Sequence, residues 1–466
     1  MRKKSTSELN MPMITTIVLL AWPTILEQLM QTAVQYIDTA MVGALGTQAT
    51  AAVGATTTVN WLINITISAI AVGFLSQIAK ACGANKKDEA INIAMQAVLI
   101  TLILGIAASV LILSISGFVP KWMQVDKEIQ ELAATYFFIL YIPMLPRTAT
   151  IILGTVLRAA GDTKTPMKVG IGINAINVVL NFLLIYPTRQ VQLFGYNIVI
   201  YGADMGVVGA AIASASAIAL GGVYIVVALW RHPAISPKGV KLRVNTEILR
   251  PCMQIALPNM MQRFGTALGY VAFAAMINYL GDEATAAHTI ANTVESAFYI
   301  PGYGMQTAAS TLAGNAFGAG DRKRLSELVR MFLPLEMLLM LLSGACLFVM
   351  APPLVKLFSS EQAVINLGVT VLRMVAISEP FYGFSIIMEG VLLGIGNTKQ
   401  PFIYNVVGMW CVRIVGTFIC TKILGFGLVS AWFCMILHNL LIFVLFFICY
   451  YSGKWNPIKV VSPCKE

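Results

Sequence analysis

Apolar residues gather into long segments that short polar and charged stretches separate. About 20 consecutive apolar residues span the hydrocarbon layer as a helix, whereas a membrane β-strand needs only about ten. Lipid also requires that backbone hydrogen bonds be satisfied inside the protein. Twelve segments meet the helical length, at 13–43, 51–82, 89–118, 129–158, 166–187, 203–231, 247–280, 285–316, 325–358, 363–394, 399–420 and 425–451. The pattern predicts an all-α polytopic membrane protein with about twelve transmembrane helices.

The second half of the chain repeats the first at a constant offset of 235 residues. The repeated motifs are Ala-Trp-Pro at 21–23 with Ala-Leu-Pro at 256–258, Leu45-Gly46 with Leu280-Gly281, Gly83-Ala84 with Gly318-Ala319, and Gly161-Asp162-Thr163-Lys164 with Gly396-Asn397-Thr398-Lys399. An even number of spans returns the chain to its starting side, so the halves are expected to be two pseudo-symmetric six-helix bundles of parallel topology. We expect an N-terminal lobe at 1–231, a cytoplasmic linker at 232–246 and a C-terminal lobe at 247–466.

Composition and charge agree with a membrane protein. Hydrophobic residues make up 58% of the chain and charged residues only 11%, against about a quarter in soluble domains. The net charge of +10 comes from Lys and Arg in short loops, which indicates membrane orientation and not nucleic-acid binding. The basic side holds Arg2-Lys3-Lys4, Lys86-Lys87, Lys164, Lys238 and Arg322-Lys323-Arg324, and the other side only scattered cases such as Lys121 and Arg189. Both termini are therefore expected in the cytoplasm.

Polar side chains inside the predicted spans need a reason, because a charge at the bilayer centre costs at least ~2.5–3.5 kcal/mol on insertion scales. The first span carries Glu27, Gln28, Gln31, Gln35 and Asp38 at steps of three or four, which places them on one helical face. The fifth span carries Asn174, Asn177 and Asn181, and the sixth carries Ser214 one turn beyond Ala210. Pro23 removes one backbone hydrogen bond and gives the first span a place to bend.

Several motifs carry a family resemblance. They are Pro23, Tyr36–Gly43, Val156–Thr163, Gly209–Ser214, Ala286-Ala287-His288 and Ser310–Asn315. Together they resemble the multidrug and toxic-compound extrusion (MATE) family, prokaryotic type, over essentially the whole chain. The resemblance implies a V-shaped pair of six-helix lobes, export of cationic or amphipathic compounds, and coupling to H⁺ or Na⁺.

The resemblance also implies a cation site in the first lobe. The family's site maps onto Asp38, Asn177, Asn181, Ser214 and the Ala210 carbonyl. Such a set of hard oxygens suits Na⁺, held by Asp38, Asn177 and Asn181, whereas Asp38 alone suits a proton. One branch of the family has an aspartate at the position of Asn181, and its loss here leaves the coupling ion open. The alternative is that these side chains only join helices by hydrogen bonds, each worth about 0.6 kcal/mol.

The second lobe has charges at comparable depth, namely Arg263, Glu295, Glu379, Glu389 and Arg413. One interpretation is that Arg–Glu pairs lock the lobe. The other is that a carboxylate, foremost Glu295, binds a cationic substrate or a second coupling ion. Another branch of the family has acidic residues in spans seven and ten, but the matching positions are Thr266 and Tyr382, so that assignment does not transfer. Further substrate candidates are Gln31, Gln35 and Tyr36.

These observations predict a secondary antiporter of the plasma (inner) membrane that exports small organic cations by alternating access. A flippase for a lipid-linked saccharide is the alternative, but it would favour a strongly cationic cleft, and the first lobe holds more acidic than basic groups. A membrane-embedded enzyme is a remote alternative, since the sequence has no HExxH, GxSxG or Walker motif. We expect a monomer in the lipid bilayer with no cofactor apart from the coupling ion, and no nucleic-acid partner.

Overall fold

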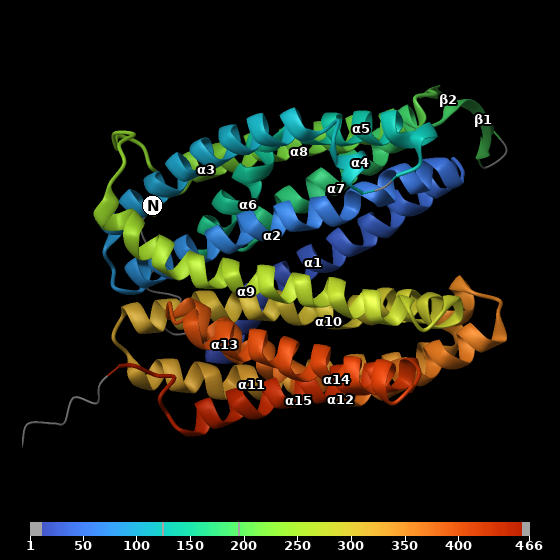
Figure 1. Ribbon diagram of the computed structural model, residues 1–466. Helices are drawn as coiled ribbons and strands as arrows, with labels where there is room; N and C mark the ends of the chain where they lie inside the picture. The colour runs from blue at the N-terminus through green and yellow to red at the C-terminus, as the bar shows by residue number, and fades with distance from the viewer. Residues whose placement is uncertain (1–11, 124, 194–195, 459–466) are drawn as a thin grey trace, which may run out of the picture. The chain divides into compact units, whose positions relative to one another are not determined.

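The computed structural model describes residues 12–123, 125–193 and 196–458, and most of them are helical (Figure 1). The first half contains α1 (Met13–Gly43), α2 (Thr47–Gly83), α3 (Lys87–Ile115), α4 (Val119–Trp122), α5 (Lys127–Tyr141), α6 (Met144–Ala159), α7 (Lys164–Leu184) and α8 (Gly206–Arg231). The second half contains α9 (Thr246–Asn278), α10 (Asp282–Gly318), α11 (Arg322–Phe358), α12 (Gln362–Gly394), α13 (Lys399–Val407), α14 (Val415–Phe418) and α15 (Leu428–Tyr451). The basic stretch 2–4 lies outside the described residues, as does the side chain of Arg189.

Each of the twelve predicted spans is helical, and the all-α polytopic prediction is confirmed. Within the described ranges, nine helices are long and apolar enough to cross a membrane, and α5 with α6 forms one further span bent by 51°. Helices α9 and α10, with 33 and 37 residues, are long enough to cross a membrane but are not among these nine. Their sequences are more polar, because they carry Arg263 and Glu295 among other polar groups. Hydropathy alone therefore does not mark these two helices as spans.

Three local features depart from a simple twelve-helix pattern. The fourth span breaks between Tyr141 and Met144, where Pro143 precedes α6 and Arg147 donates to the Leu140 carbonyl at 3.3 Å. A hairpin of β1 (Pro187–Leu193) and β2 (Tyr196–Ala203) connects α7 to α8. The eleventh span contains two π-helical stretches, Gly408–Ile414 and Ile419–Ile423. Each break frees backbone groups that other residues must bond. The hydrophobic periodicity of the sequence therefore does not predict where the breaks occur.

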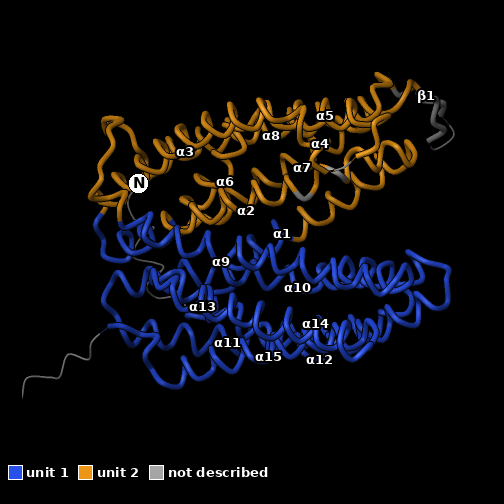
Figure 2. Tube along the Cα trace, viewed as in Figure 1, with its two compact units in different colours: residues 1–28, 75–86, 251–466 blue, residues 29–74, 87–250 orange. Residues whose placement is uncertain are grey.

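The chain forms two compact units, which Figure 2 shows in blue and orange. Unit 1 comprises residues 1–28, 75–86 and 251–466, and unit 2 comprises 29–74 and 87–250. Two segments of the first half, the start of α1 and the end of α2, thus group with the second half. The lobe limits 1–231 and 247–466 follow from the repeat and stay a prediction.

Glycines explain why the end of α2 belongs to unit 1. A Cβ on Gly83 would lie 2.6 Å from the carbonyl carbon of Asn315, and a Cβ on Gly318 would lie 2.6 Å from Cα of Lys80. Gly318 is the repeat counterpart of Gly83, and Asn315 is the counterpart of Lys80, because each pair is 235 residues apart. The two copies of the motif therefore contact each other reciprocally, and Ser76 Oγ adds a hydrogen bond of 2.9 Å to the Gly394 carbonyl.

The linker that was expected at 232–246 is fixed to unit 2 by polar side chains. Gln96 of α3 donates to the Arg243 carbonyl at 2.8 Å, and its oxygen accepts from the Asn245 amide at 3.0 Å. His232 Nδ1 accepts from the backbone amides of Ala234 and Ile235. Burial lowers the pKa of His232, while Asp162 acts in the opposite direction.

The reciprocal glycine contact predicts the effect of a single methyl group. Replacing Gly83 with Ala should lower the free energy of unfolding by about 1–3 kcal/mol, because the added carbon meets backbone that cannot turn away. Gly172→Ala in α7 is the matched control, since a Cβ there has nothing within 4 Å. Thermal unfolding of the purified variants measures the difference. Equal midpoints for the two variants would contradict the close approach.

Candidate functional site

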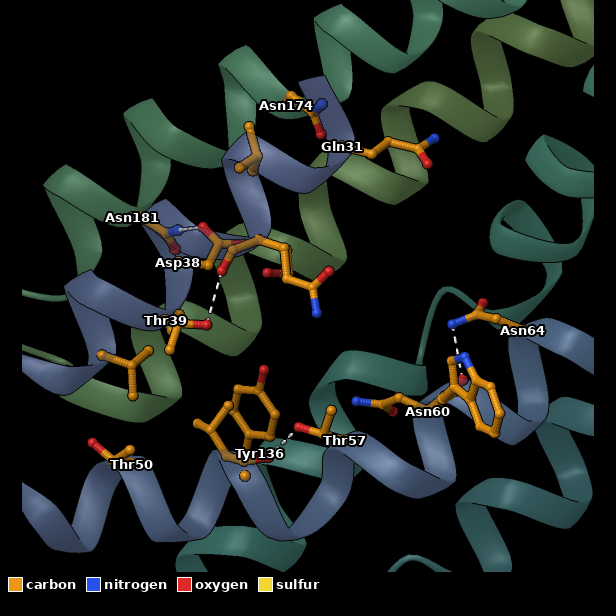
Figure 3. Close-up of a pocket in the computed structure, with 18 residues that line it drawn as sticks. Gln31, Asp38, Thr39, Thr50, Thr57, Asn60, Asn64, Tyr136, Asn174 and Asn181 are labelled. Carbon is orange, nitrogen blue, oxygen red and sulfur yellow. Dashed lines mark hydrogen bonds between the residues drawn. The ribbon is translucent and has the colours of Figure 1, made fainter. Parts of the chain in front are cut away.

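Unit 2 contains a cavity of about 500 Å³, a size typical of small-molecule sites. Figure 3 shows its lining, to which α1, α2, α5, α7 and α8 contribute. Asp38 is the one charged side chain among the lining residues. The others are polar or apolar: Gln31, Val34, Gln35, Thr39, Val42, Thr50, Val53, Gly54, Thr57, Asn60, Trp61, Asn64, Tyr136, Asn174, Asn181, Ala210 and Ser214.

Asp38 is held by an amide from α7. Asn181 Nδ2 donates to Asp38 Oδ1 at 2.7 Å, and Figure 3 shows this bond between α1 and α7. Asn181 is buried, and within the described structure its Oδ1 has no hydrogen-bond partner. A buried amide oxygen without a partner is a ready ligand for a cation or a bound water.

Asn177 connects the Asp38 carboxylate to α8. In one orientation its Nδ2 donates to Ser214 Oγ at 2.9 Å, and its Oδ1 accepts from Asn181 Nδ2 at 3.2 Å. With the amide turned about its Cβ–Cγ bond, the nitrogen lies 2.8 Å from Asp38 Oδ1 and 3.2 Å from Oδ2, and the oxygen accepts from Ser214 Oγ at 2.9 Å. The turned amide therefore gives Asp38 a second donor.

Helical spacing and one glycine bring these groups together. Asn174, Asn177 and Asn181 recur every three or four residues, so they share one face of α7. Helix α8 lies close to the end of α7, because a Cβ on Gly209 would sit 2.5 Å from the Leu184 carbonyl oxygen. This approach brings Ser214 within hydrogen-bond distance of Asn177.

Hydrogen bonds connect four of the five residues that the family resemblance implied, all except Ala210. Asp38, Asn181 and Ser214 line the cavity, and Asn177, which is not among the lining residues, bonds to Asn181 and Ser214. Ala210 also lines the cavity one turn before Ser214. Of the further candidates, Gln31 and Gln35 line the cavity. Tyr36 is not among the lining residues, and 39% of it is exposed.

Sequence reasoning missed the contribution of α2 and α5. Helix α2 presents Thr57, Asn60, Trp61 and Asn64 to the cavity. Their spacing of three to four residues is the same signal that revealed the stripe on α1, and it would have found them. Tyr136 of α5 also lines the cavity, but nothing in its local sequence distinguishes it from an aromatic residue that only packs.

The charged candidates of the second half lie in unit 1, where amides and aromatic rings surround them. Glu389 accepts from Gln262 Nε2 at 2.7 Å. The Arg413 guanidinium lies 4.1 Å from the ring centre of Phe273 and 4.8 Å from that of Tyr270.

Glu295 and Glu379 are buried in the same unit. All five charged candidates (Arg263, Glu295, Glu379, Glu389 and Arg413) are described, and no Arg–Glu distance of 4.0 Å or less joins any of them. The interpretation that Arg–Glu pairs lock this lobe therefore lacks a direct ion pair, and a role for Glu295 in binding stays a prediction.

Pro23 lies inside α1, in the part that belongs to unit 1. The next residue, Thr24, places its Oγ1 2.8 Å from the Gly304 carbonyl of α10 and 2.8 Å from the Ala21 carbonyl. Unit 2 begins at Leu29, still within α1. The proline therefore lies within the segment of α1 that is anchored to α10, and the segment that carries Asp38 follows it.

Comparison with known proteins identifies the family. The MatE profile matches residues 23–183 and 258–419, and the two stretches begin 235 residues apart (258 minus 23), as the internal repeat does. The probable multidrug resistance protein NorM of Thermotoga maritima is 27% identical over 450 residues, which are 96% of this chain and 94% of the relative. The probable multidrug resistance protein YoeA of Bacillus subtilis is 24% identical over 418 residues, 88% and 87% of the two chains.

Solved structures show the same fold. A MATE protein in the straight conformation matches with a TM-score of 0.87 at 21% identity, over 98% of this chain and 99% of the other. A MOP superfamily transporter from Pyrococcus furiosus matches with a TM-score of 0.88 at 21% identity and the same coverage. The twelve helices, the duplicated motifs and the two profile matches agree: this chain belongs to the MATE family.

Proposed function

We propose that the chain is a secondary active multidrug efflux antiporter, which exports organic cationic or amphipathic compounds in exchange for H⁺ or Na⁺. The observation that supports the proposal is that Asp38 is the one charged group in the lining of a drug-sized cavity. Relatives that align over nearly the whole chain are named as probable multidrug resistance proteins.

The lining favours a cationic, partly apolar substrate. A carboxylate attracts a positive charge, and the faces of Trp61 and Tyr136 can hold a cation or a flat ring. The amides of α2 and α7 add donors and acceptors without a fixed pattern, which suits ligands of varied shape. The pyrophosphate headgroup of a lipid-linked saccharide would need Lys or Arg, and no basic residue is present among the lining residues.

Exchange follows if ion and substrate compete for the same carboxylate. An ionised Asp38 accepts hydrogen bonds from Asn181 and from the turned Asn177 amide. In the other orientation Asn177 presents its Oδ1 to a carboxylate oxygen of Asp38. Two oxygens cannot form a hydrogen bond without a proton between them, so this orientation requires Asp38 to be protonated. A proton bound there neutralises the charge that holds the organic cation. Na⁺ would instead use the Asp38 carboxylate, the free oxygen of Asn181 and Ser214 Oγ.

The proposed setting is the plasma (inner) membrane, with a monomer whose termini are both cytoplasmic. Large apolar side chains are exposed along α3, including Ile103, Ile106 and Val110. Lipid chains cover such a surface at no cost, whereas water would not. The orientation follows from the basic loops, Lys86-Lys87 and Arg322-Lys323-Arg324 among them.

Asp38→Asn tests the central claim. The variant should insert into the membrane normally but lose efflux of a fluorescent organic cation to the level of empty vesicles, because an amide neither binds a proton nor attracts the cation. Asp126→Asn, which changes an exposed carboxylate before α5, is the matched control and should transport normally. Proteoliposomes under an imposed pH gradient, and separately under a Na⁺ gradient, give the measurement. Undiminished transport by Asp38→Asn would refute the proposal.

Asn181→Asp tests the choice of ion. A second carboxylate next to Asp38 should create a stronger Na⁺ site, so that Na⁺ raises the unfolding temperature of this variant more than that of the unaltered protein. Saturation at 100 times the dissociation constant corresponds to about 2.7 kcal/mol of added stability. Asn174→Asp, about two turns earlier on the same face of α7, is the control, and K⁺ replaces Na⁺ in a parallel series. An identical Na⁺ response in all three proteins would exclude this position as a sodium ligand.

Pro23→Ala tests whether α1 bends during transport. Alanine restores the backbone N–H that proline lacks and stiffens the helix, so the turnover rate should fall while substrate affinity is retained. Pro12→Ala, just before α1, serves as the control. A turnover rate equal to that of the unaltered protein would exclude Pro23 as a hinge.

A further inference from the structure

Unit 1 has two hydrophobic clusters, and α10, α11, α12 and α15 contribute to both. On α10, α11 and α12 the buried members of the first cluster lie at 305–316, 325–333 and 384–392. Those of the second lie at 284–294, 347–355 and 364–376 of the same three helices. Between them remain 295–304 of α10, 334–346 of α11 and 377–383 of α12. We call these three stretches the waist of unit 1.

The waist combines groups that are rare inside a membrane. Each of its three stretches holds one buried glutamate, namely Glu295, Glu336 and Glu379. Each also holds one proline, namely Pro301, Pro334 and Pro380. Proline removes a backbone hydrogen bond and is the commonest cause of helix kinks. Each of the three helices therefore has a proline at which it can bend close to its buried glutamate, where no buried member of either cluster lies and only partly buried residues such as Leu335 and Phe298 pack against the clusters.

Glu336 is the most enclosed of these carboxyl groups. Its exposed fraction is 0%, and within the described structure neither of its oxygens has a hydrogen-bond partner. Two glycines make room for it. A Cβ on Gly302 would lie 2.5 Å from Glu336 Oε1, and a Cβ on Gly383 would lie 3.3 Å from Glu336 Cγ. The methionine one turn further along α11, Met340, fills the remaining space against both glycines.

Among the described residues, no basic side chain lies within 4.0 Å of Glu336. The waist also holds Glu295, Tyr299 and Tyr303 on α10 and Glu379 and Tyr382 on α12. The charges of Arg413 and Arg263 act on Glu295 and Tyr303, whereas no charged group acts on Glu336. The hydroxyl groups of Tyr303 and Tyr382 lie 2.9 Å apart and bond to each other. An ionised carboxylate without a donor or a cation is very costly in such a place, whereas the uncharged acid is tolerated.

From this geometry we infer that Glu336 is a second proton-binding site, loaded in the conformation described here, and that the waist must open before the proton can leave. On release the proton passes from a carboxyl oxygen of Glu336 to water, and the carboxylate that remains requires water or hydroxyl donors. The prolines of α10, α11 and α12 supply the bend that admits them. The inference extends the proposed function, because it adds a proton site in unit 1 to the one at Asp38.

Infrared difference spectroscopy of the protein in lipid tests the site directly. A protonated carboxyl group has a C=O stretching band that a carboxylate lacks. The spectrum of the unaltered protein should contain such a band that is missing from Glu336→Gln, whose amide has nearly the same shape. Glu327→Gln is the control, because Glu327 lies on the same helix, pairs with Lys323 and is half-exposed. Identical protonated-carboxyl bands in the unaltered protein and in Glu336→Gln would overturn the inference.

A second variant keeps the test decisive if Glu336→Gln does not fold. Gly302→Ala keeps the acid but presses a methyl group against its Oε1. The band should shift in this variant, whereas Gly172→Ala should leave it in place. A band that does not respond to Gly302→Ala would show that it belongs to another carboxyl group.

Transport separates this inference from the proposed function. Efflux driven by a pH gradient should be lost in Glu336→Gln, because its amide can neither bind nor release a proton. Binding of the organic cation at constant pH should stay unchanged. Efflux equal to that of the unaltered protein would show that the site is not coupled to transport. Absence of efflux in the unaltered protein would refute the proposed function instead, and the infrared result would still decide whether Glu336 holds a proton.

Discussion

A carboxyl group inside a membrane has to be hydrogen-bonded, open to water or uncharged, and the architecture of this protein is arranged around that requirement. Asp38 meets it with the amides of α7 and a cavity on its other side. Glu336 has no hydrogen-bond donor for either oxygen and is packed against Gly302 and Gly383, so the uncharged acid is the form with the lower free energy there. The two groups therefore represent two ways of keeping an acid in a low dielectric, one in each unit.

The same requirement relates the site to the helices that build it. Asp38 of α1 accepts a hydrogen bond from Asn181 of α7 and faces the cavity, and Ser214 of α8 bonds in turn to Asn177. The amide of Asn177 has both a donor and an acceptor, so its two orientations present either a nitrogen or an oxygen to Asp38. A carboxylate in place of Asn181 would add a second titratable charge, whereas the amide leaves Asp38 as the one titrating carboxylate among the lining residues.

Glycine has a complementary role in unit 1. Gly83 and Gly318 let two backbones meet across the internal repeat, and Gly302 and Gly383 leave space for an acid. In lipid there is little hydrophobic force between helices, so close backbone contact at small residues supplies much of the attraction. Rigid glycine contacts at the end of α2 and a proline-rich waist further along α10 give one unit a fixed part and a bendable part.

The amino-acid sequence predicts the number and type of spans, the duplication and four polar residues of the first site, but not the part of its lining that comes from α2 and α5. Those features depend on local composition and helical spacing, and Asp38, Asn177, Asn181 and Ser214 were found by spacing together with the family resemblance. The tertiary structure decided the rest. It placed the ends of α1 and α2 with the second half, broke the fourth span at Pro143, and brought Tyr136 to the cavity. It also enclosed Glu336, which reads in the sequence as one polar residue in an apolar segment. These four features depend on which helices pack together and how closely. Helix packing is set by contacts between residues that can lie hundreds of positions apart, and local sequence patterns do not show those contacts.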